Sequence, residues 1–128
     1  MTQIQRYLLP EEMEPVSHYC HATRAGDRVW ISGTVGVRED GSVPHDVVEQ
    51  FQVAIDSIDR CLKAAGAEAR HVVKVVVLLT DINDRSAINP IRQHYFGEHL
   101  PASTLFEVSA LVAPEMKVEV EVEAIISE

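Results

Sequence analysis

The stretch Leu100–Ser127, LPASTLFEVSALVAPEMKVEVEVEAIIS, decides the fold of this chain. It contains two runs in which apolar and polar residues alternate, one on each side of a break at Ala113-Pro114. A period of two is typical of a β-strand that buries one face and exposes the other. The stretch therefore predicts two strands near the end of the sequence.

Each run divides its side chains between two faces. The first run places on one face Thr104, Phe106, Val108 and Ala110, and on the other Ser103, Leu105, Glu107 and Ser109. In the second run one face is apolar, and the other face carries Lys117, Glu119, Glu121 and Glu123. Three carboxylates spaced about 7 Å apart repel one another unless water or partners solvate them. Two interpretations follow: a face exposed to solvent, or a wet cleft that uses one carboxylate.

Length and charge limit the class of protein. The chain has 128 residues, of which 46% are hydrophobic and 24% are charged, which predicts a single domain over residues 1–128 that buries its own core. The net charge of −9 argues against nucleic acid or an acidic membrane as the main partner, because both require a positive surface.

The sequence gives little indication of a targeting signal, a reactive cysteine or a metal site. No apolar run is long enough to span a membrane, and residues 1–10 lack a basic segment followed by an apolar one, so we expect a cytoplasmic protein without a membrane partner. Cys20 and Cys61 form no CxxC pattern, which favours free thiols over a disulfide or a nucleophile. The six histidines show no metal-ligand pattern, so no metal site is expected.

Four further segments predict strands. Residues 3–9 and His18–Ala22 suggest short strands, and Val29–Ser32 is a better candidate because it is rich in β-formers. The β-branched run Val72–Thr80 predicts a central strand that is buried on both faces. Gly33 follows the strongest part of its strand, where an interior glycine often marks a bulge or a close approach to the backbone.

Two segments predict helices. Asp46 and Glu49 form a capping-box pattern before an apolar stripe with helical spacing, and Gly66 supplies a stop in the left-handed conformation. In the second segment, Asn89 is expected to cap a helix that begins at Pro90, because proline is favoured in a first turn and costly further inside.

The order of these elements predicts an α+β fold: a two-layer sandwich made of a mixed β-sheet with two helices on one face. Right-handed crossovers place both helices on the same side of the sheet. No element remains to cover the other face, although its central strand is apolar. We therefore predict that this face packs against another copy of the chain.

Known catalytic motifs do not explain the polar residues. The chain has no P-loop, dinucleotide fingerprint or GxSxG motif. The candidates that remain for a site are Tyr19, Ser32, Gly33, Asn89, Ser103, Glu107 and Glu121. Each of them alone could also serve a purely structural role, so their meaning depends on whether they converge in space.

Several motifs in order resemble the Rid family, also called YjgF-like or L-PSP endoribonuclease-like, over essentially the full length. The matching pieces are VWISGTVG, the AAG end of the first helix, KVVVLLTDINDRSAIN, and LPAST-LFEVSAL with VEVEVEAI. The last pair resembles the family signature, P-A-R followed by a strand and a closing E-x-E-A-I. The resemblance implies a chorismate-mutase-like α+β fold and a homotrimer with ligand clefts between subunits.

The resemblance also implies that the protein hydrolyses small-molecule substrates, namely imines or enamines, and that it needs no cofactor. A cleft carboxylate would position or activate water, and an arginine would bind the substrate carboxylate. By position, Tyr19 matches a cleft tyrosine, Gly33 a glycine whose backbone contacts the ligand, and Asn89 a cleft asparagine. Glu121 matches the glutamate near the water and is the expected catalytic residue.

The sequence departs from the family pattern where the ligand carboxylate would bind. Ser103 stands at the arginine of P-A-R, and Leu105 at a frequent cysteine. Losing a buried, charge-assisted pair costs on the order of 2–5 kcal/mol, because serine cannot make a bidentate ionic contact. We therefore expect a substrate without the carboxylate, with Ser103 and Thr104 as neutral hydrogen-bonding groups. The alternatives are a non-catalytic ligand-binding or interaction trimer and an endoribonuclease, against which the net charge argues.

Overall fold

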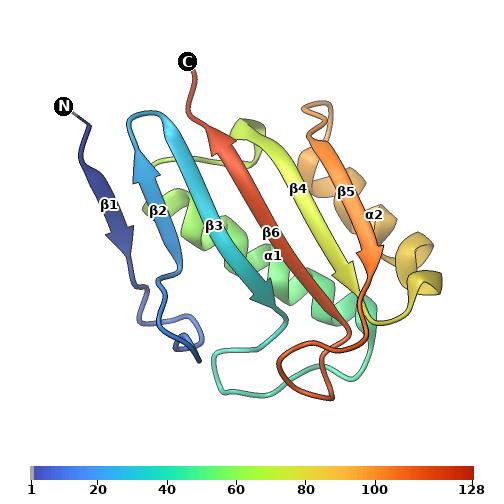
Figure 1. Ribbon diagram of the computed structural model, residues 1–128. Coiled ribbons are helices and arrows are strands. Elements are labelled where there is room, and N and C mark those ends of the chain that lie inside the picture. Colours follow the sequence, from blue (N-terminus) through green and yellow to red (C-terminus); the bar gives the residue numbers. More distant parts are fainter. Residues whose placement is uncertain (1) are drawn as a thin grey trace.

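One mixed sheet of six strands is the frame of the molecule (Figure 1). The computed structural model describes residues 2–128. The strand order is β1-β2-β3-β6-β4-β5, and every neighbouring pair is antiparallel except β4 and β5. The strands are β1 (Ile4–Tyr7), β2 (Ala22–Ala25), β3 (Arg28–Val35), β4 (Val72–Leu79), β5 (Ala102–Glu107) and β6 (Val118–Ile125).

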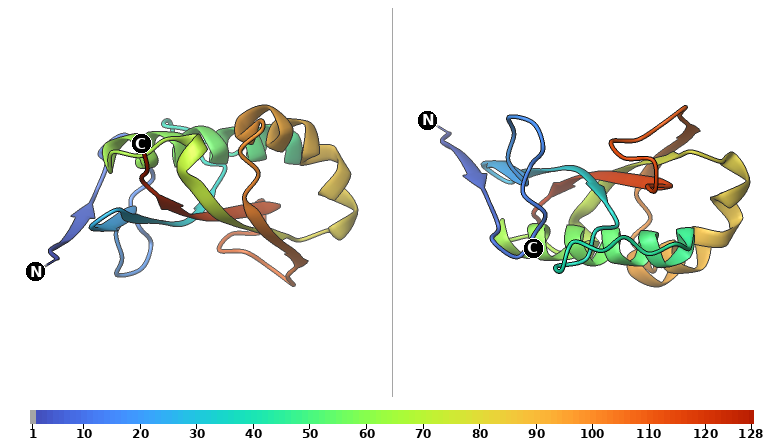
Figure 2. Two further views of the ribbon diagram at one scale, coloured as in Figure 1. Left: turned by 90° about the horizontal axis from the view of Figure 1, so that it is seen from above. Right: turned by 90° about the horizontal axis from the view of Figure 1, so that it is seen from below.

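Two helices, α1 (Val47–Ala64) and α2 (Arg85–Phe96), cover the same face of this sheet (Figure 2). Two 3₁₀ turns, η1 (Ala69–His71) and η2 (Ile82–Asp84), precede β4 and α2. The result is the α+β two-layer sandwich that the order of elements predicts. None of the helices among the described residues is long and apolar enough to cross a membrane.

The core lies between the sheet and the helices. Alternate residues of β6 point toward α1 and are at most 2% exposed, namely Val118, Val120, Val122 and Ala124. The apolar stripe of α1 meets them with Phe51, Ile55, Ile58 and Leu62, none more than 1% exposed. The two sequence periods, two in the strand and about 3.6 in the helix, therefore bury one shared interface.

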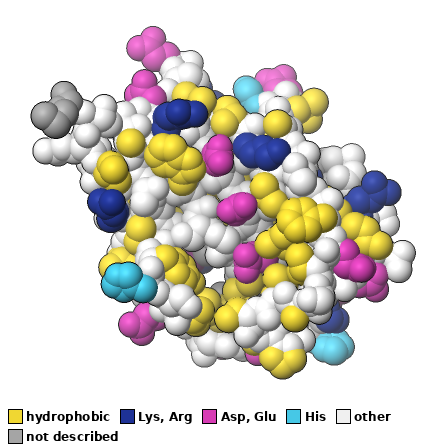
Figure 3. Space-filling model, viewed as in Figure 1, with side chains coloured by type: hydrophobic (Ala, Val, Ile, Leu, Met, Phe, Trp, Pro, Cys, Tyr) yellow, Lys and Arg dark blue, Asp and Glu magenta, His cyan; other side chains and the backbone are white. Residues whose placement is uncertain are grey.

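The opposite face of the sheet carries no helix, and we call it the open face. Large apolar side chains are exposed there, including Trp30 at 36% and Phe106 at 46%. Acidic side chains lie among apolar ones in the middle of this face (Figure 3). The prediction that β4 is buried on both faces is wrong for the single chain, because Val76 and Leu78 on this side are only half-buried.

Two predicted strands have different bounds in the structure. The predicted strand His18–Ala22 shares only Ala22 with β2, because the residues before Ala22 form the end of a loop in which the His21 ring is hydrogen-bonded to Leu9 and Met13. β5 ends at Glu107 and does not continue to Ala110. The Val108 amide still donates a hydrogen bond of 2.8 Å to the carbonyl of Leu79, the last residue of its parallel partner β4, and the pairing of the two strands ends there.

The predicted helix starts also need correction. Asp46 is the N-cap of α1, but its side chain makes no capping hydrogen bond, and Glu49 instead pairs with Arg38 at 3.3 Å. The second helix begins at Arg85 and contains Pro90 inside it, so Asn89 is a helical residue and not a cap.

The turn before α2 explains its earlier start. The Asp81 carboxylate accepts a hydrogen bond of 2.9 Å from the Asn83 amide and so caps η2, which leads directly into the helix. Pro90 has no amide proton, so the carbonyl of Ser86, one turn earlier, loses its helical hydrogen bond. Both residues are exposed. Water can therefore satisfy the free carbonyl, which lowers the cost of an interior proline.

Candidate functional site

A groove crosses the open face where β3 pairs with β6. It has a volume of about 430 Å³, which is suited to a small molecule. Its lining residues come from both strands and from the β1–β2 and β5–β6 loops: Met13, Val16, Tyr19, Ser32, Gly33, Val35, Val112, Glu119 and Glu121. The structure thus brings together four of the residues that the sequence suggested as a site, namely Tyr19, Ser32, Gly33 and Glu121.

A bulge in β3 shapes this groove. The pairing register with β6 shifts between Ile31 and Thr34. A Cβ atom on Gly33 would lie only 2.4 Å from a carboxylate oxygen of Glu119. The Ser32 hydroxyl donates a hydrogen bond of 2.6 Å to the carbonyl of Cys20. The interior glycine therefore marks a bulge and a close approach of another side chain, as its position in the strand suggested.

Two carboxylates of β6 give the groove its charge. Glu121 is exposed, whereas Glu119 is half-buried beside it on the same face of the strand. Burial raises the pKa of Glu119, and the negative charge of Glu121 raises it further. The groove thus pairs a carboxylate open to solvent with one that releases its proton less readily, an arrangement suited to proton transfer.

The other predicted binding residues lie elsewhere on the single chain. The Ser103 hydroxyl accepts a hydrogen bond of 2.8 Å from Nη2 of Arg92, so this side chain points toward α2. Thr104 points to the open face and accepts a hydrogen bond of 2.9 Å from Lys74. Asn89 lines a depression of about 210 Å³ between α2 and the start of β5.

Leu105 is half-buried and lines a separate hollow with residues of η2 and the start of α2. Within one chain, Asn89, Ser103 and Leu105 therefore do not join Glu121. They belong to the β5–α2 edge, while the groove belongs to β3 and β6.

Sequence reasoning missed the loop residues of the groove and Arg92. Met13, Val16 and Val112 lie in loops without any regular period, so no pattern marks them. Arg92 had a usable indication, because it follows Asn89 by three residues on one helix, a spacing that places two side chains on the same face.

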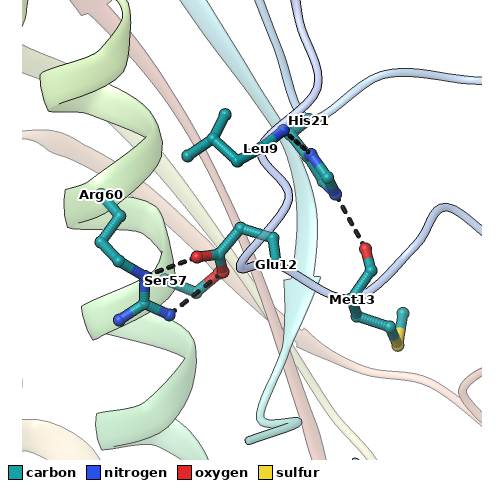
Figure 4. Close-up of polar contacts among 6 residues, drawn as sticks. All are labelled: Leu9, Glu12, Met13, His21, Ser57 and Arg60. Atoms are coloured by element: carbon teal, nitrogen blue, oxygen red, sulfur yellow. Dashed lines mark hydrogen bonds and ion pairs between the residues drawn. The ribbon is translucent and has the colours of Figure 1, made fainter. Parts of the chain in front are cut away.

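The β1–β2 loop, which forms one wall of the groove, is tied to the helix layer by Glu12 (Figure 4). The Glu12 side chain is 4% exposed, and its carboxylate accepts hydrogen bonds from Ser57 and from Nη2 of Arg60, the latter at 3.1 Å. His21 binds the same loop. Its Nδ1 accepts from the Leu9 amide at 2.9 Å, and its Nε2 lies 2.8 Å from the Met13 carbonyl oxygen.

We expect Glu12→Gln to lower the free energy of unfolding at neutral pH by about 2 kcal/mol, because it removes ionic hydrogen bonds. Burial opposes ionisation of Glu12, but the hydrogen bonds from Arg60 and Ser57 outweigh it and hold its pKa below the ordinary 4.5. A lowered acid pKa stabilises the fold above the ordinary value, and this contribution is lost as the pH falls through the folded value.

Urea unfolding of wild type and variant at pH 7 and at pH 3 measures this contribution. The difference between the two proteins should shrink at the lower pH. A difference that is equal at both pH values would show that the Glu12 charge does not stabilise the loop.

Cys61 does not offer an activated nucleophile, and the Cys20 thiol donates a hydrogen bond of 3.3 Å to the carbonyl of Ala22. Both are free, Cys20 half-buried and Cys61 buried. Burial raises the pKa of Cys61 to about 12, so its thiol stays protonated at neutral pH. Within residues 2–128, no three His, Cys, Asp or Glu side chains are grouped so that they could hold a metal ion.

Comparison with known proteins identifies the family. The model of the family described as endoribonuclease L-PSP matches residues 10–126. A relative from Mus musculus, named 2-iminobutanoate/2-iminopropanoate deaminase, is 36% identical over 129 residues, which cover 98% of this chain and 93% of the relative.

Solved structures agree with this match. YyfA from Yersinia pestis, described as a protein of unknown function of the Rid family, superposes with a TM-score of 0.90 at 28% identity and covers 97% of this chain and 100% of its own. TdcF from E. coli, solved with bound serine, has a TM-score of 0.89 at 26% identity over 96% of this chain and 99% of its own. The chain therefore belongs to the endoribonuclease L-PSP family, the Rid or YjgF-like proteins that its motifs resemble.

Proposed function

We propose that this chain hydrolyses a reactive imine or enamine in the groove between β3 and β6. The observation that carries the proposal is the placement of Glu121 beside Tyr19 and the β3 bulge, in a chain 36% identical to a named imine deaminase. The groove is open, has the size of a small metabolite and holds a solvent-exposed carboxylate that can bind a water molecule.

In this proposal Glu121 acts as a general base. It accepts a proton from water as the water oxygen attacks the carbon of the C=N bond, and it then returns the proton to the nitrogen. The intermediate then carries a hydroxyl and an amino group on one carbon. The hydroxyl proton passes to the amino nitrogen through the same carboxylate, the C–N bond breaks, a carbonyl forms and ammonia leaves. An enamine first gains a proton on its β-carbon and loses one from nitrogen, which gives the imine. No electrons are gained or lost, so the reaction needs only water. Glu119, whose pKa is raised by burial, is the neighbouring group that can hold a proton during these steps.

The proposed site is completed by a second copy of the chain. The open face carries exposed Trp30 and Phe106, and Asn89 and Ser103 lie at the β5–α2 edge, away from the groove. A homotrimer in which this edge approaches the groove of the next subunit would gather these residues around one ligand.

Light scattering at micromolar concentration tests this assembly. We expect about three times the chain mass of 14.2 kDa. A stable monomer would overturn the shared site.

A second candidate is a ligand-binding protein without turnover, which is favoured by one related structure, that of TdcF with bound serine. An endoribonuclease activity has less support. Two carboxylates line the groove, and the net charge of −9 repels phosphate groups.

The proposed activity is tested with 2-iminobutanoate generated in situ by a threonine dehydratase, and with an imine of similar size that lacks the carboxylate. Release of ammonia from at least one of them should be faster with the protein than in buffer. If neither reaction is accelerated, the hydrolase proposal fails. Thermal stabilisation by a small molecule without any turnover would instead support the binding protein.

A further inference from the structure

We propose that Arg92, positioned by Ser103, binds the carboxylate of an imino acid substrate in this chain. This inference rests on the proposed imine hydrolysis and names the part of the site that recognises an anion. The ligand class is a small 2-imino acid or its 2-oxo acid product, both of which carry a planar carboxylate.

The first support is the state of the Arg92 side chain. It is half-buried, and the described residues form no ion pair with it. Burial lowers the pKa of Arg92, and no neighbouring carboxylate compensates. Four other cations of the chain each pair with an acidic side chain: Arg38, Arg60, Lys63 and Arg70. A guanidinium that is partly removed from water without an anion gains most when an anionic ligand arrives.

The second support is the surrounding pocket. Arg92 lines the depression of about 210 Å³ at the β5–α2 edge, and none of the residues that line it is acidic: Asn89, Arg92, Gln93, Phe96, Gly97, Leu100 and Pro101. Asn89 lies one helical turn before Arg92 and adds an amide donor on the same face. A guanidinium and an amide together match the oxygens of a carboxylate.

Ser103 fixes where this guanidinium lies. Its hydroxyl accepts one hydrogen bond from Nη2 of Arg92 at 2.8 Å, and a guanidinium has five N–H donors, so donors remain for a ligand. An arginine at position 103 would bring a second positive charge to this contact, which Arg92 would disfavour. In this proposal α2 supplies the positive charge that β5 lacks at position 103, so the chain can bind a carboxylate substrate although Ser103 replaces the arginine of the family pattern.

Arg92→Met removes the charge but keeps an apolar stem, and Arg6→Met on the exposed strand β1, at the opposite edge of the sheet, is the control. We expect Arg92→Met to lower kcat/KM for 2-iminobutanoate by about 100-fold, mainly through KM. Its effect on the imine without a carboxylate should be less than about threefold. Arg6→Met should leave the turnover of both substrates unchanged, and circular dichroism checks that each variant is folded.

Relocation of the charge provides a second test. The double variant Arg92→Met/Ser103→Arg should recover at least about tenfold of the lost kcat/KM, since it returns a guanidinium to the same contact. Calorimetry with 2-oxobutanoate measures binding without turnover, and we expect binding to wild type and the double variant but not to Arg92→Met.

These results separate the two proposals. Equal losses for charged and neutral imines, or unchanged 2-oxobutanoate binding by Arg92→Met, would overturn the role of Arg92 while leaving imine hydrolysis intact. If wild type hydrolyses no imine, the proposed activity fails, but loss of 2-oxobutanoate binding in Arg92→Met would still support the anion site.

Discussion

Glu121→Gln should lower the rate of imine hydrolysis by about 10²–10⁴-fold, the usual contribution of a general base. Glutamine keeps the size of the side chain but cannot accept a proton from water. The substitution lies on the exposed side of β6, away from the helix-facing core, so the fold and assembly should be unaffected. The measurement is kcat with the substrate that wild type prefers, together with light scattering of both proteins.

Glu123→Gln is the control for charge on the same strand. Glu123 is also exposed on the open face, two residues further along β6, but it does not line the groove. Its replacement should change kcat less than about threefold. Similar activity in wild type and Glu121→Gln would reject the catalytic role of Glu121, and similar losses in both variants would point to the general negative potential of the strand.

Gly36→Ala should reduce the free energy of unfolding by about 3 kcal/mol or more, through forced displacement of packed backbone. Gly36 follows β3 and is buried against α1. An added Cβ would lie 2.3 Å from the carbonyl oxygen of Gln50 and 2.7 Å from its Cα, and helix backbone cannot move aside as a side chain can. Urea unfolding followed by circular dichroism measures the loss.

The matched control is Gly33→Ala, three residues earlier. There the added Cβ would meet the end of the flexible Glu119 side chain and not backbone. We expect this variant to keep most of its stability but to alter the groove. Equal stability of Gly36→Ala and wild type would show that the β3–α1 contact is looser than the structure indicates.

Local periodicity predicts most of this fold. The alternation in β6 and the stripe in α1 each specify which side chains face the core, because burial follows the repeat of the element. The bounds of β5 and α2 could not be read in the same way. β5 stops where its partner β4 stops, and α2 starts where a capped 3₁₀ turn leads into it, so both depend on neighbouring segments.

The candidate site also contains residues that the sequence could reveal and residues that it could not. Gly33 could be recognised because a glycine interrupts the β-forming residues of its strand, and the bulge that it marks lies in the groove with Tyr19 and Glu121. The contact between Arg92 and Ser103 joins a helix to a strand and exists only after packing, so spacing along the chain cannot reveal it.

The walls of the groove have a different origin from its floor. The floor belongs to the paired strands β3 and β6, whereas Met13 and Val16 come from the β1–β2 loop and Val112 from the β5–β6 loop. Insertions and deletions are tolerated best in such connections. Homologues or engineered variants can therefore change the length of the β5–β6 loop and accept a molecule of another shape, while the carboxylates beneath keep their register. The β1–β2 loop is less free to change, because Glu12 and His21 hold it in place. Loop exchange is accordingly the least disruptive route to a new ligand preference on this scaffold.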